Sequence, residues 1–208
     1  MIRCAVFLTG AIPPRDLGEI DVTICADSGA IPLHERGVVP NYLVGDMDSI
    51  PEHILDEMER CGSIIERYPE DKDISDGEAG VRKAVSLDPR RIDIYGGRNG
   101  RSDHVLSSYH LLHLVPREIH TSLHLDDDKV ILIRCGEELK VTTQRRIISV
   151  MPATPECIVS IKGLKWELER EQLKMGSTMG IHNENIGSSF TVRADSGEIY
   201  LIMIGDRS

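Results

Sequence analysis

The sequence lacks a long hydrophobic run. No segment approaches the roughly 20 apolar residues that a membrane-spanning helix needs. The stretch from Met1 to Ala11 combines a short apolar run with too little positive charge for a signal peptide. We therefore expect a cytoplasmic protein with no membrane partner.

Clustered basic residues are also missing. The chain carries 24 Lys and Arg residues against 34 Asp and Glu residues, a formal charge of −10 at pH 7. Nucleic acids are bound chiefly through Lys and Arg, so this balance argues against a nucleic-acid partner. An acidic protein that handles a polyphosphate needs a cation between the two, and Mg²⁺ fits that need.

Cysteine is scarce and scattered, and no C-x-x-C pair occurs. Three of the five cysteines lie in apolar runs, where they are expected to be small buried hydrophobes. This usage predicts a reducing compartment and no structural zinc site. The five are Cys4, Cys25, Cys61, Cys135 and Cys157.

The first part of the chain alternates short apolar runs with helical patterns, which predicts an α/β fold with a mostly parallel sheet flanked by helices. We expect this domain to cover residues 1–117. Ser49 to Glu52 has the pattern of a capping box at a helix start. The expected strands are 2–8, 22–26, 42–45, 63–67 and 91–95, and the main expected helices are 51–60, 76–86 and one through 105–112.

Helical periodicity fades near Arg117, and short apolar runs with turn signals follow. Residues 118–208 therefore predict an antiparallel β domain, a sandwich or a partial barrel. We expect strands at 122–125, 130–134, 139–142, 147–151, 158–162, 190–194 and 199–204. A polar excursion runs from Trp166, the only tryptophan, to Asn185, and its part 174–188 is interpreted as a binding or dimer-contact loop.

Acidic side chains gather in two loops of the first domain. Asp46 and Asp48 follow the predicted strand 42–45, where open α/β sheets bind ligands, and Asp71, Asp73 and Asp76 follow the next strand. Crowded carboxylates repel one another unless a cation neutralises them, and Mg²⁺ prefers oxygen ligands and keeps substrate phosphates in its shell. The pattern suggests a Mg²⁺-dependent phosphoryl or pyrophosphoryl transferase, and a solvated loop is the alternative for either cluster alone.

Further candidate loops follow other strands. Asp27 and Ser28 come after strand 22–26 and would either bind an anion at a helix start or simply cap it. The loop 96–104 combines glycines with Arg98 and Arg101, which can offer a planar fork to phosphates, and Asp103 could cap the next helix or reach the metal. His104 is interpreted as structural rather than catalytic, and Asp126 to Asp128 as a hairpin turn rather than a metal cluster.

Taken in order, these motifs resemble the thiamine pyrophosphokinase family over nearly the whole chain. The segments that carry the resemblance are Ala26-Asp27-Ser28-Gly29-Ala30, Gly45-Asp46-Met47-Asp48-Ser49, Asp71-Lys72-Asp73-Ile74-Ser75-Asp76-Gly77-Glu78, Gly100-Arg101-Ser102-Asp103-His104, Gly163-Leu164-Lys165-Trp166 and Asn183-Glu184. Three positions depart from the usual family pattern: Ser28 and Asn99 stand where glycine is common, and His182 replaces a serine.

The resemblance implies an α/β nucleotide-binding domain followed by a β-sandwich, working as a homodimer. Asp27, Ser28, Asp48, Arg101 and Asp103 would contact Mg²⁺-ATP. Trp166 and Asn183 would contact thiamine in a cleft shared between subunits. The metal would be held by Asp46, Asp48, Asp71, Asp73 and Asp76.

The implied reaction is attack by the thiamine hydroxyl on the β-phosphorus of ATP, giving thiamine diphosphate and AMP. Catalysis is assigned to Asp46, Asp71 and Asp73, and either Asp71 or Asp73 would accept the hydroxyl proton. Two alternatives stay open: a pyrophosphokinase for another ring alcohol such as a hydroxymethyl pterin, and a nucleotide sensor without turnover.

Overall fold

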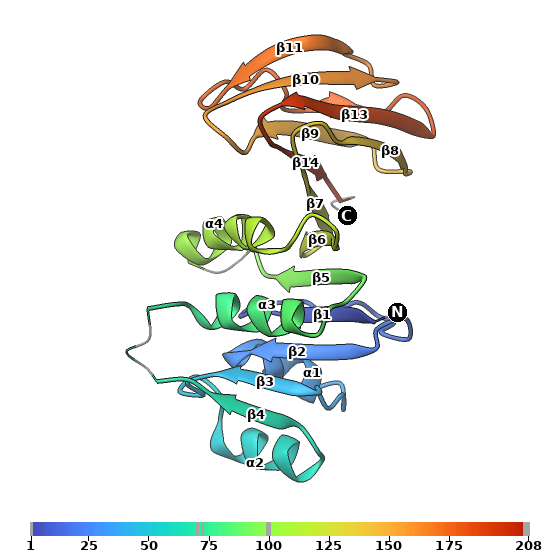
Figure 1. Ribbon diagram of the computed structural model, residues 1–208. Coiled ribbons are helices and arrows are strands. Elements are labelled where there is room, and N and C mark those ends of the chain that lie inside the picture. Colours follow the sequence, from blue (N-terminus) through green and yellow to red (C-terminus); the bar gives the residue numbers. More distant parts are fainter. Residues whose placement is uncertain (1, 70, 72, 99–100, 206–208) are drawn as a thin grey trace. The chain divides into compact units, whose positions relative to one another are not determined.

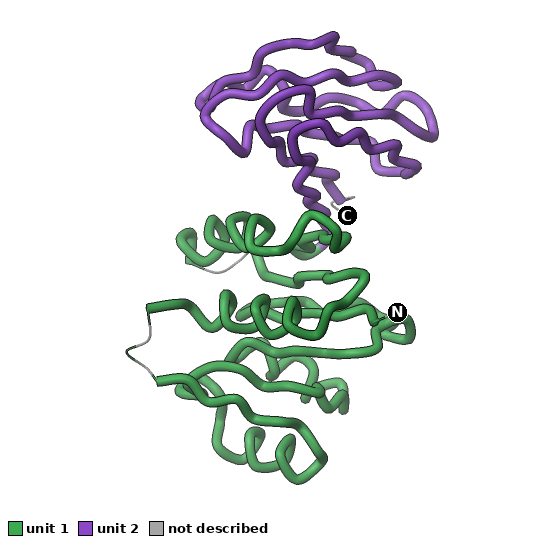
Figure 2. Tube along the Cα trace, viewed as in Figure 1, with its two compact units in different colours: residues 1–126 green, residues 127–208 purple. Residues whose placement is uncertain are grey.

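The computed structural model describes residues 2–69, 71, 73–98 and 101–205. The chain divides into two compact units, residues 1–126 and 127–208 (Figure 2). The division falls later than the expected boundary at residue 117. The difference arises because β6 (His120–Leu125) pairs in parallel with β5 (Arg91–Gly96) and so belongs to the first unit.

The first unit contains a parallel sheet with the strand order β6-β5-β1-β2-β3-β4. Neighbouring strands in this order all pair in parallel, which confirms the predicted α/β sheet. The other strands are β1 (Arg3–Phe7), β2 (Val22–Ala26), β3 (Tyr42–Gly45) and β4 (Ile64–Arg67).

Helices cover both faces of this sheet (Figure 1). On one face, Leu33 of α1 (Ile31–His34) and Met58 of α2 (Glu52–Arg60) are buried in one core with Phe7 and Leu43 of the strands. On the other face, Gly80 of α3 (Asp76–Ser86) approaches Val6 so closely that an added Cβ would lie 3.3 Å from its Cγ1 atom. The remaining elements of this unit are η1 (Asp27–Ala30), α4 (Ser102–Leu111) and η2 (Leu112–Leu114).

The capping box predicted at Ser49 is wrong. Helix α2 begins after Pro51 with no side-chain cap, because the Ser49 hydroxyl instead donates to Asp48 Oδ1 at 2.8 Å. A cap occurs at α3, where Ser75 Oγ accepts a hydrogen bond from the backbone N–H of Glu78 at 3.2 Å. This cap fixes the start of α3 next to the acidic loops.

The second unit is built of two antiparallel sheets, with strand orders β12-β9-β14-β7 and β11-β10-β13-β8. Their inner faces share one core that includes Ile148 and Leu201 from the first sheet and Val159 and Val192 from the second. The predicted β-sandwich is thereby confirmed. The strands are β7 (Asp128–Ile133), β8 (Glu138–Thr142), β9 (Ile147–Pro152), β10 (Glu156–Lys162), β11 (Leu168–Lys174), β12 (Asn183–Glu184), β13 (Ser189–Ser196) and β14 (Ile199–Met203).

Strand β11 lies where the sequence predicted a polar excursion, so that part of the prediction is wrong. It pairs with β10 at an edge of its sheet and buries only Leu173. A charged edge strand carries no alternating apolar pattern, and for this reason the sequence did not indicate β11. None of the helices within the described ranges is long and apolar enough to cross a membrane.

Candidate active site

The predicted functional loops of the first unit gather at one edge of the sheet. The strands are parallel, so the segments that follow β1, β2, β3 and β5 all leave from the same edge. The chain passes from β1 outward to β2, β3 and β4, and then returns to β5 on the other side of β1. Such a change of direction opens a crevice at the carboxyl ends of the strands, where ligands bind in α/β proteins.

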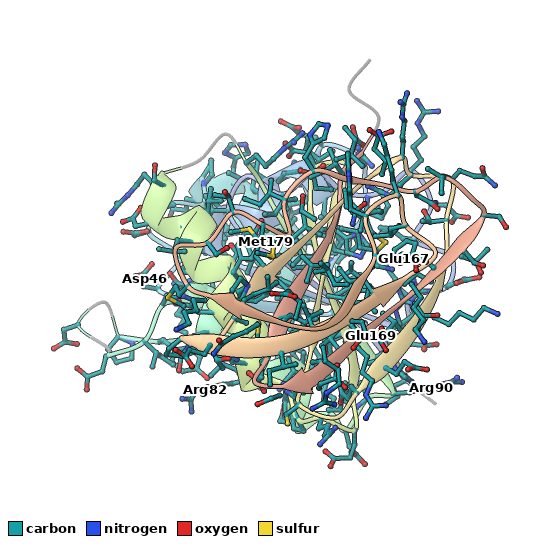
Figure 3. All side chains as sticks on the ribbon, turned by 90° about the horizontal axis from the view of Figure 1, so that it is seen from above. Asp46, Arg82, Arg90, Glu167, Glu169 and Met179 are labelled. Carbon is teal, nitrogen blue, oxygen red and sulfur yellow. The ribbon has the colours of Figure 1, made fainter. Side chains whose placement is uncertain are left out.

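Three carboxylates meet at this edge. Asp27, Asp46 and Asp48 each offer an oxygen, and these oxygens lie within 4.8 Å of one another. Met47 adopts a left-handed φ of 67°, which turns the loop so that the Asp48 N–H donates to Asp46 Oδ1 at 3.1 Å. The Asp46 side chain is labelled in Figure 3. The structure thus brings together two of the predicted metal ligands with a residue that was predicted to bind the nucleotide.

Asp27 is the buried member of this group, with an exposed fraction of 6%. Burial raises the pKa of its carboxyl group; the backbone of Ser28 and the side chain of Ser49 oppose that shift, while Asp76 and Asp48 add to it. Its Oδ1 atom is buried and accepts no hydrogen bond from any described residue. A buried carboxylate oxygen beside two other carboxylates is a good ligand for a hard divalent cation, so these residues fit Mg²⁺.

Asp76 stands against the same group from the first turn of α3. A Cβ atom on Gly45 would lie 2.9 Å from Asp76 Oδ1 and 3.3 Å from the Asp27 Cβ atom. Gly45 has a φ of 148°, so the absence of a side chain there allows both aspartates to approach the end of β3. Of the second acidic loop, Asp76 is therefore the residue that the fold places beside the three carboxylates.

Asp71 and Asp73 lie in the connection between β4 and α3, and both are exposed. Within the described part of the chain they are not members of the carboxylate group. Lys72, which belongs to the same predicted motif, lies outside the described residues.

A pocket of about 490 Å³ is lined by Asp76, which stands beside the three carboxylates. Gly10 and Gly97 line it where the loops after β1 and β5 nearly touch, since a Cβ on Gly97 would lie 2.2 Å from the Gly10 carbonyl oxygen. Its volume is in the usual range for a small-molecule site. The lining is part apolar (Leu8, Ile12, Ala26, Leu111) and part polar (Thr9, Ser75, Arg101, His104, Ser107, Ser108, Asp126).

Arg101 lines this pocket and pairs with Asp103. Its Nε and Nη2 atoms donate to the two oxygens of Asp103 at 3.2 and 2.6 Å. The pairing raises the pKa of Arg101 and lowers the pKa of Asp103. Asp103 does not cap α4 as its N-cap residue, which is Arg101. Asn99 and Gly100 lie outside the described residues.

Ser28 is held by a side-chain contact, with its Oγ atom 3.0 Å from Thr9 Oγ1. Thr9, just past the expected strand 2–8, and Asp126, interpreted from the sequence as part of a hairpin turn, both line the pocket. For Thr9 a signal was present, because it follows a buried strand as the acidic loops do. For Asp126 the decisive fact is the position of β6 beside β5, which the sequence pattern did not reveal.

In the second unit, Trp166 is half exposed and its backbone is fixed by Asn183. Asn183 Oδ1 accepts from the Trp166 N–H at 3.1 Å, and Asn183 Nδ2 donates to the Trp166 carbonyl at 2.6 Å. Lys165 Nζ lies 4.4 Å from the centre of the Trp166 ring and donates to Glu184 Oε1 at 2.9 Å. The Trp166 side chain is therefore partly exposed to solvent, while hydrogen bonds with Asn183 hold its backbone in place.

His182 precedes this cluster with a left-handed φ of 60°, and its N–H donates to Ser149 Oγ at 3.0 Å. The side chain that departs from the family pattern therefore sits on a loop tied to β9 by its backbone. Hydrogen bonds from Lys165 and Arg146 lower the pKa of Glu184, the next acidic side chain.

Comparison with known proteins agrees with both units. A family model described as "Thiamin pyrophosphokinase, catalytic domain" matches residues 16–123, just over half of the chain, and one described as "Thiamin pyrophosphokinase, vitamin B1 binding domain" matches residues 132–199. The chain belongs to the thiamin pyrophosphokinase family. The first family model includes the three carboxylates, and the second includes Trp166 and Asn183.

Individual relatives in this family are distant in sequence. Thiamine pyrophosphokinase of Bacillus subtilis (strain 168) is 28% identical over 186 residues, covering 88% of this chain and 87% of that protein. Thiamine pyrophosphokinase 2 of Arabidopsis thaliana is 25% identical, covering 87% of this chain and 77% of that protein.

Solved structures share the fold of the family. A crystal structure of thiamine pyrophosphokinase from Bacillus subtilis has a TM-score of 0.87 at 24% identity and covers 99% of this chain and 100% of that chain. Thiamin pyrophosphokinase from Candida albicans has a TM-score of 0.82 at 17% identity, covering 97% of this chain and 90% of that chain.

Proposed function

We propose that this member of the thiamin pyrophosphokinase family transfers the pyrophosphoryl group of ATP to the hydroxyl of thiamine, giving thiamine diphosphate and AMP. One observation carries the proposal. In a chain of this family, three carboxylates converge at the rim of a parallel sheet and adjoin a pocket of nucleotide size.

The proposed metal ligands are the acidic residues of this rim. Asp27, Asp46 and Asp48 would hold Mg²⁺, with Asp76 beside them and Asp71 and Asp73 contributed by the exposed connection before α3. Bound Mg²⁺ would neutralise charge on the triphosphate. The buried Oδ1 of Asp27 supports this assignment, because a cation would supply the partner that it lacks among the described residues.

The chain's own residues would do the remaining work of the reaction. The pocket would hold the nucleotide, and Arg101 would offer its guanidinium to the phosphates in place of Asp103. Asp71 or Asp73 would accept the proton of the attacking hydroxyl, and their exposure leaves them accessible to an incoming alcohol. Such transfers depend mainly on positioning and charge neutralisation.

Thiamine would stack on Trp166, with Asn183 fixing the backbone beneath it. We also propose a homodimer in which thiamine lies in a cleft shared between subunits. Support comes from exposed apolar side chains of the second unit near Trp166 in sequence, namely Met175, Met179, Ile181 and Ile186. The free thiols of all the cysteines support a reducing compartment, and we propose the cytoplasm.

The deciding experiment measures AMP formation from ATP and Mg²⁺ with and without thiamine. We expect thiamine-dependent AMP release that Asp73→Asn abolishes and Trp166→Ala weakens chiefly by raising KM for thiamine. Asp88→Asn, at an exposed position far from the rim in sequence, is the matched control and should leave the rate unchanged. Binding of Mg²⁺-ATP without AMP formation, or AMP formation only with a hydroxymethyl pterin, would contradict the proposal.

A further inference from the structure

Asp126 forms part of the pocket wall at the carboxyl end of β6. Its backbone has a left-handed φ of 51°, and its side chain is largely buried, with an exposed fraction of 15%. Arg98, from the loop after β5, donates from Nε to Asp126 Oδ2 at 2.9 Å. The ion pair therefore fixes one oxygen of a carboxylate that borders the pocket.

The distance between Asp126 and the three carboxylates follows from the order of the strands. Asp27 follows β2, Asp46 follows β3 and Asp126 follows β6, with β5 and β1 between β6 and β2. Neighbouring strands are about 4.8 Å apart, so roughly 14 Å of sheet edge separates Asp126 from Asp27 and roughly 19 Å separates it from Asp46. A ligand that reaches both ends must be elongated, as a nucleoside triphosphate is.

This separation fixes the direction of the nucleotide if its phosphates meet the three carboxylates. The nucleoside end then lies over the ends of β1 and β5, toward β6. The apolar part of the lining that follows β1, Leu8 and Ile12, suits a base. The ribose is then the polar part of the nucleoside that would lie next to Asp126.

A carboxylate only accepts hydrogen bonds, and a ribose presents two hydroxyl donors on one side of its ring. Among the described residues, Asp126 Oδ1 accepts no hydrogen bond, while Oδ2 is held by Arg98. An acidic side chain at a strand end reads ribose hydroxyls by the same chemistry in dinucleotide-binding folds. We propose that Asp126 is a specificity-determining residue that accepts hydrogen bonds from the ribose hydroxyls of the nucleotide, so that the protein prefers ribonucleotides to deoxyribonucleotides.

Arg98 is a positioning residue in this arrangement. Its guanidinium donates to Asp126 Oδ2 and so orients the carboxylate, and Arg98 itself is not part of the pocket lining among the described residues. Arg98→Gln should therefore reduce the preference for ribonucleotides less than removal of the carboxylate does. The inference rests on the proposed function in that the ligand is a nucleoside triphosphate, but it does not depend on the acceptor.

The test is calorimetric binding of ATP, 2′-deoxy-ATP and 3′-deoxy-ATP in the presence of Mg²⁺ and without thiamine. The unmodified protein should bind ATP about tenfold more tightly than either deoxy analogue, the size expected for one hydrogen bond to a charged group. Asp126→Gly, which suits the left-handed backbone, should bind all three nucleotides alike, because ATP loses the hydrogen bonds of two hydroxyls and each deoxy analogue loses only that of its one remaining hydroxyl. Asp126→Asn keeps an acceptor without the charge and should give an intermediate ratio.

Asp127→Asn is the matched control, because it removes the neighbouring exposed carboxylate and should keep the full preference. Equal loss of affinity for all three nucleotides in Asp126→Gly would overturn the inference, since a merely structural role predicts that result. Equal binding of all three by the unmodified protein, or no binding of any, would also overturn it. A ribose preference in a protein that forms no thiamine diphosphate would leave this inference standing while the proposed function fails.

Discussion

The carboxylate of Asp76 lies directly against the backbone of Gly45, where a Cβ atom would be 2.9 Å from Asp76 Oδ1. We expect Gly45→Ala to push this carboxylate and Asp27 away from the end of β3. Displacement of catalytic groups by a fraction of an ångström lowers turnover strongly, so the rate of AMP formation should fall at least about tenfold. Steady-state kinetics over a range of Mg²⁺ concentrations would measure the effect.

Gly62→Ala is the control for this substitution. Gly62 also has a left-handed backbone, with φ of 104°, but nothing lies within 4 Å of its added Cβ. Both variants carry backbone strain, whereas only Gly45→Ala meets a carboxylate. A similar loss of turnover in both variants would show that strain alone, and not displacement of Asp76, is responsible.

Asp27→Asn should weaken metal binding without lowering the stability of the ligand-free protein. Asp27 Oδ1 is buried, has no hydrogen-bond donor among the described residues and lies close to other carboxylates. An amide there removes repulsion, so without ligand the free energy of unfolding should stay equal or rise. With Mg²⁺-ATP at 100 times its Kd, the unmodified protein should gain about 2.7 kcal/mol, and the variant much less.

Chemical denaturation with EDTA and with Mg²⁺-ATP would measure both quantities. Asp56→Asn, an exposed carboxylate of α2, serves as the control and should show the full gain. Full stabilisation of Asp27→Asn by Mg²⁺-ATP would remove Asp27 from the metal site.

Much of the site follows from the sequence because parallel strands end at one sheet edge. Once the strand before Asp46 and Asp48 is recognised, their position at that edge follows. The strand before Asp27 likewise places this residue at the sheet edge. Its membership of the carboxylate group could not be predicted, because that depends on its left-handed φ of 45° and on its burial. Those are tertiary properties with no local sequence signal.

Elements whose side chains face solvent were harder to predict. Strand β11 carries charged residues on an edge, so neither helical nor alternating periodicity marks it. The place of Asp126 in the pocket wall requires the order β6-β5-β1, because a turn residue becomes part of a site only when its strand lies next to the right neighbour.

Asn183→Ala should impair the use of thiamine through Trp166. The substitution removes both hydrogen bonds that Asn183 makes to the Trp166 backbone, at 3.1 and 2.6 Å. Buried polar groups left without partners cost about 1 to 3 kcal/mol of unfolding free energy. A loosened Trp166 should raise KM for thiamine while kcat changes little.

Trp166→Ala provides the comparison for Asn183→Ala. Trp166 is 51% exposed, so this variant should raise KM for thiamine with a smaller loss of stability. Kinetics with varied thiamine, together with urea unfolding, would measure both effects. A fall in kcat at unchanged KM for either variant would place Trp166 outside the thiamine site.

Asp93 should make the stability of the first unit depend on pH. It is fully buried on β5, where Arg3 Nε donates at 3.1 Å, Arg91 Nη2 at 2.8 Å and Ser122 Oγ at 2.7 Å. Burial alone would raise the pKa of Asp93, but the hydrogen bonds from His124, Arg91 and Ser122 hold it well below its usual range.

Because folding lowers this pKa, the ionised carboxylate stabilises the folded state. The contribution is complete above the pKa of about 3.9 for an unfolded Asp and is lost as the pH falls toward the folded-state pKa. Asp93→Asn leaves Arg91 without its charge partner and Arg3 with Glu19 alone, and it should cost about 3 kcal/mol near neutral pH. The difference in unfolding free energy between Asp93→Asn and the unmodified protein should become steadily smaller below about pH 4. Urea unfolding at several pH values would measure this difference. Asp88→Asn, at an exposed position, is the control and should unfold with the same free energy as the unmodified protein at every pH. A gap for Asp93→Asn that is equally large at pH 3 and pH 7 would mean that lost packing, and not the charge of Asp93, causes the destabilisation.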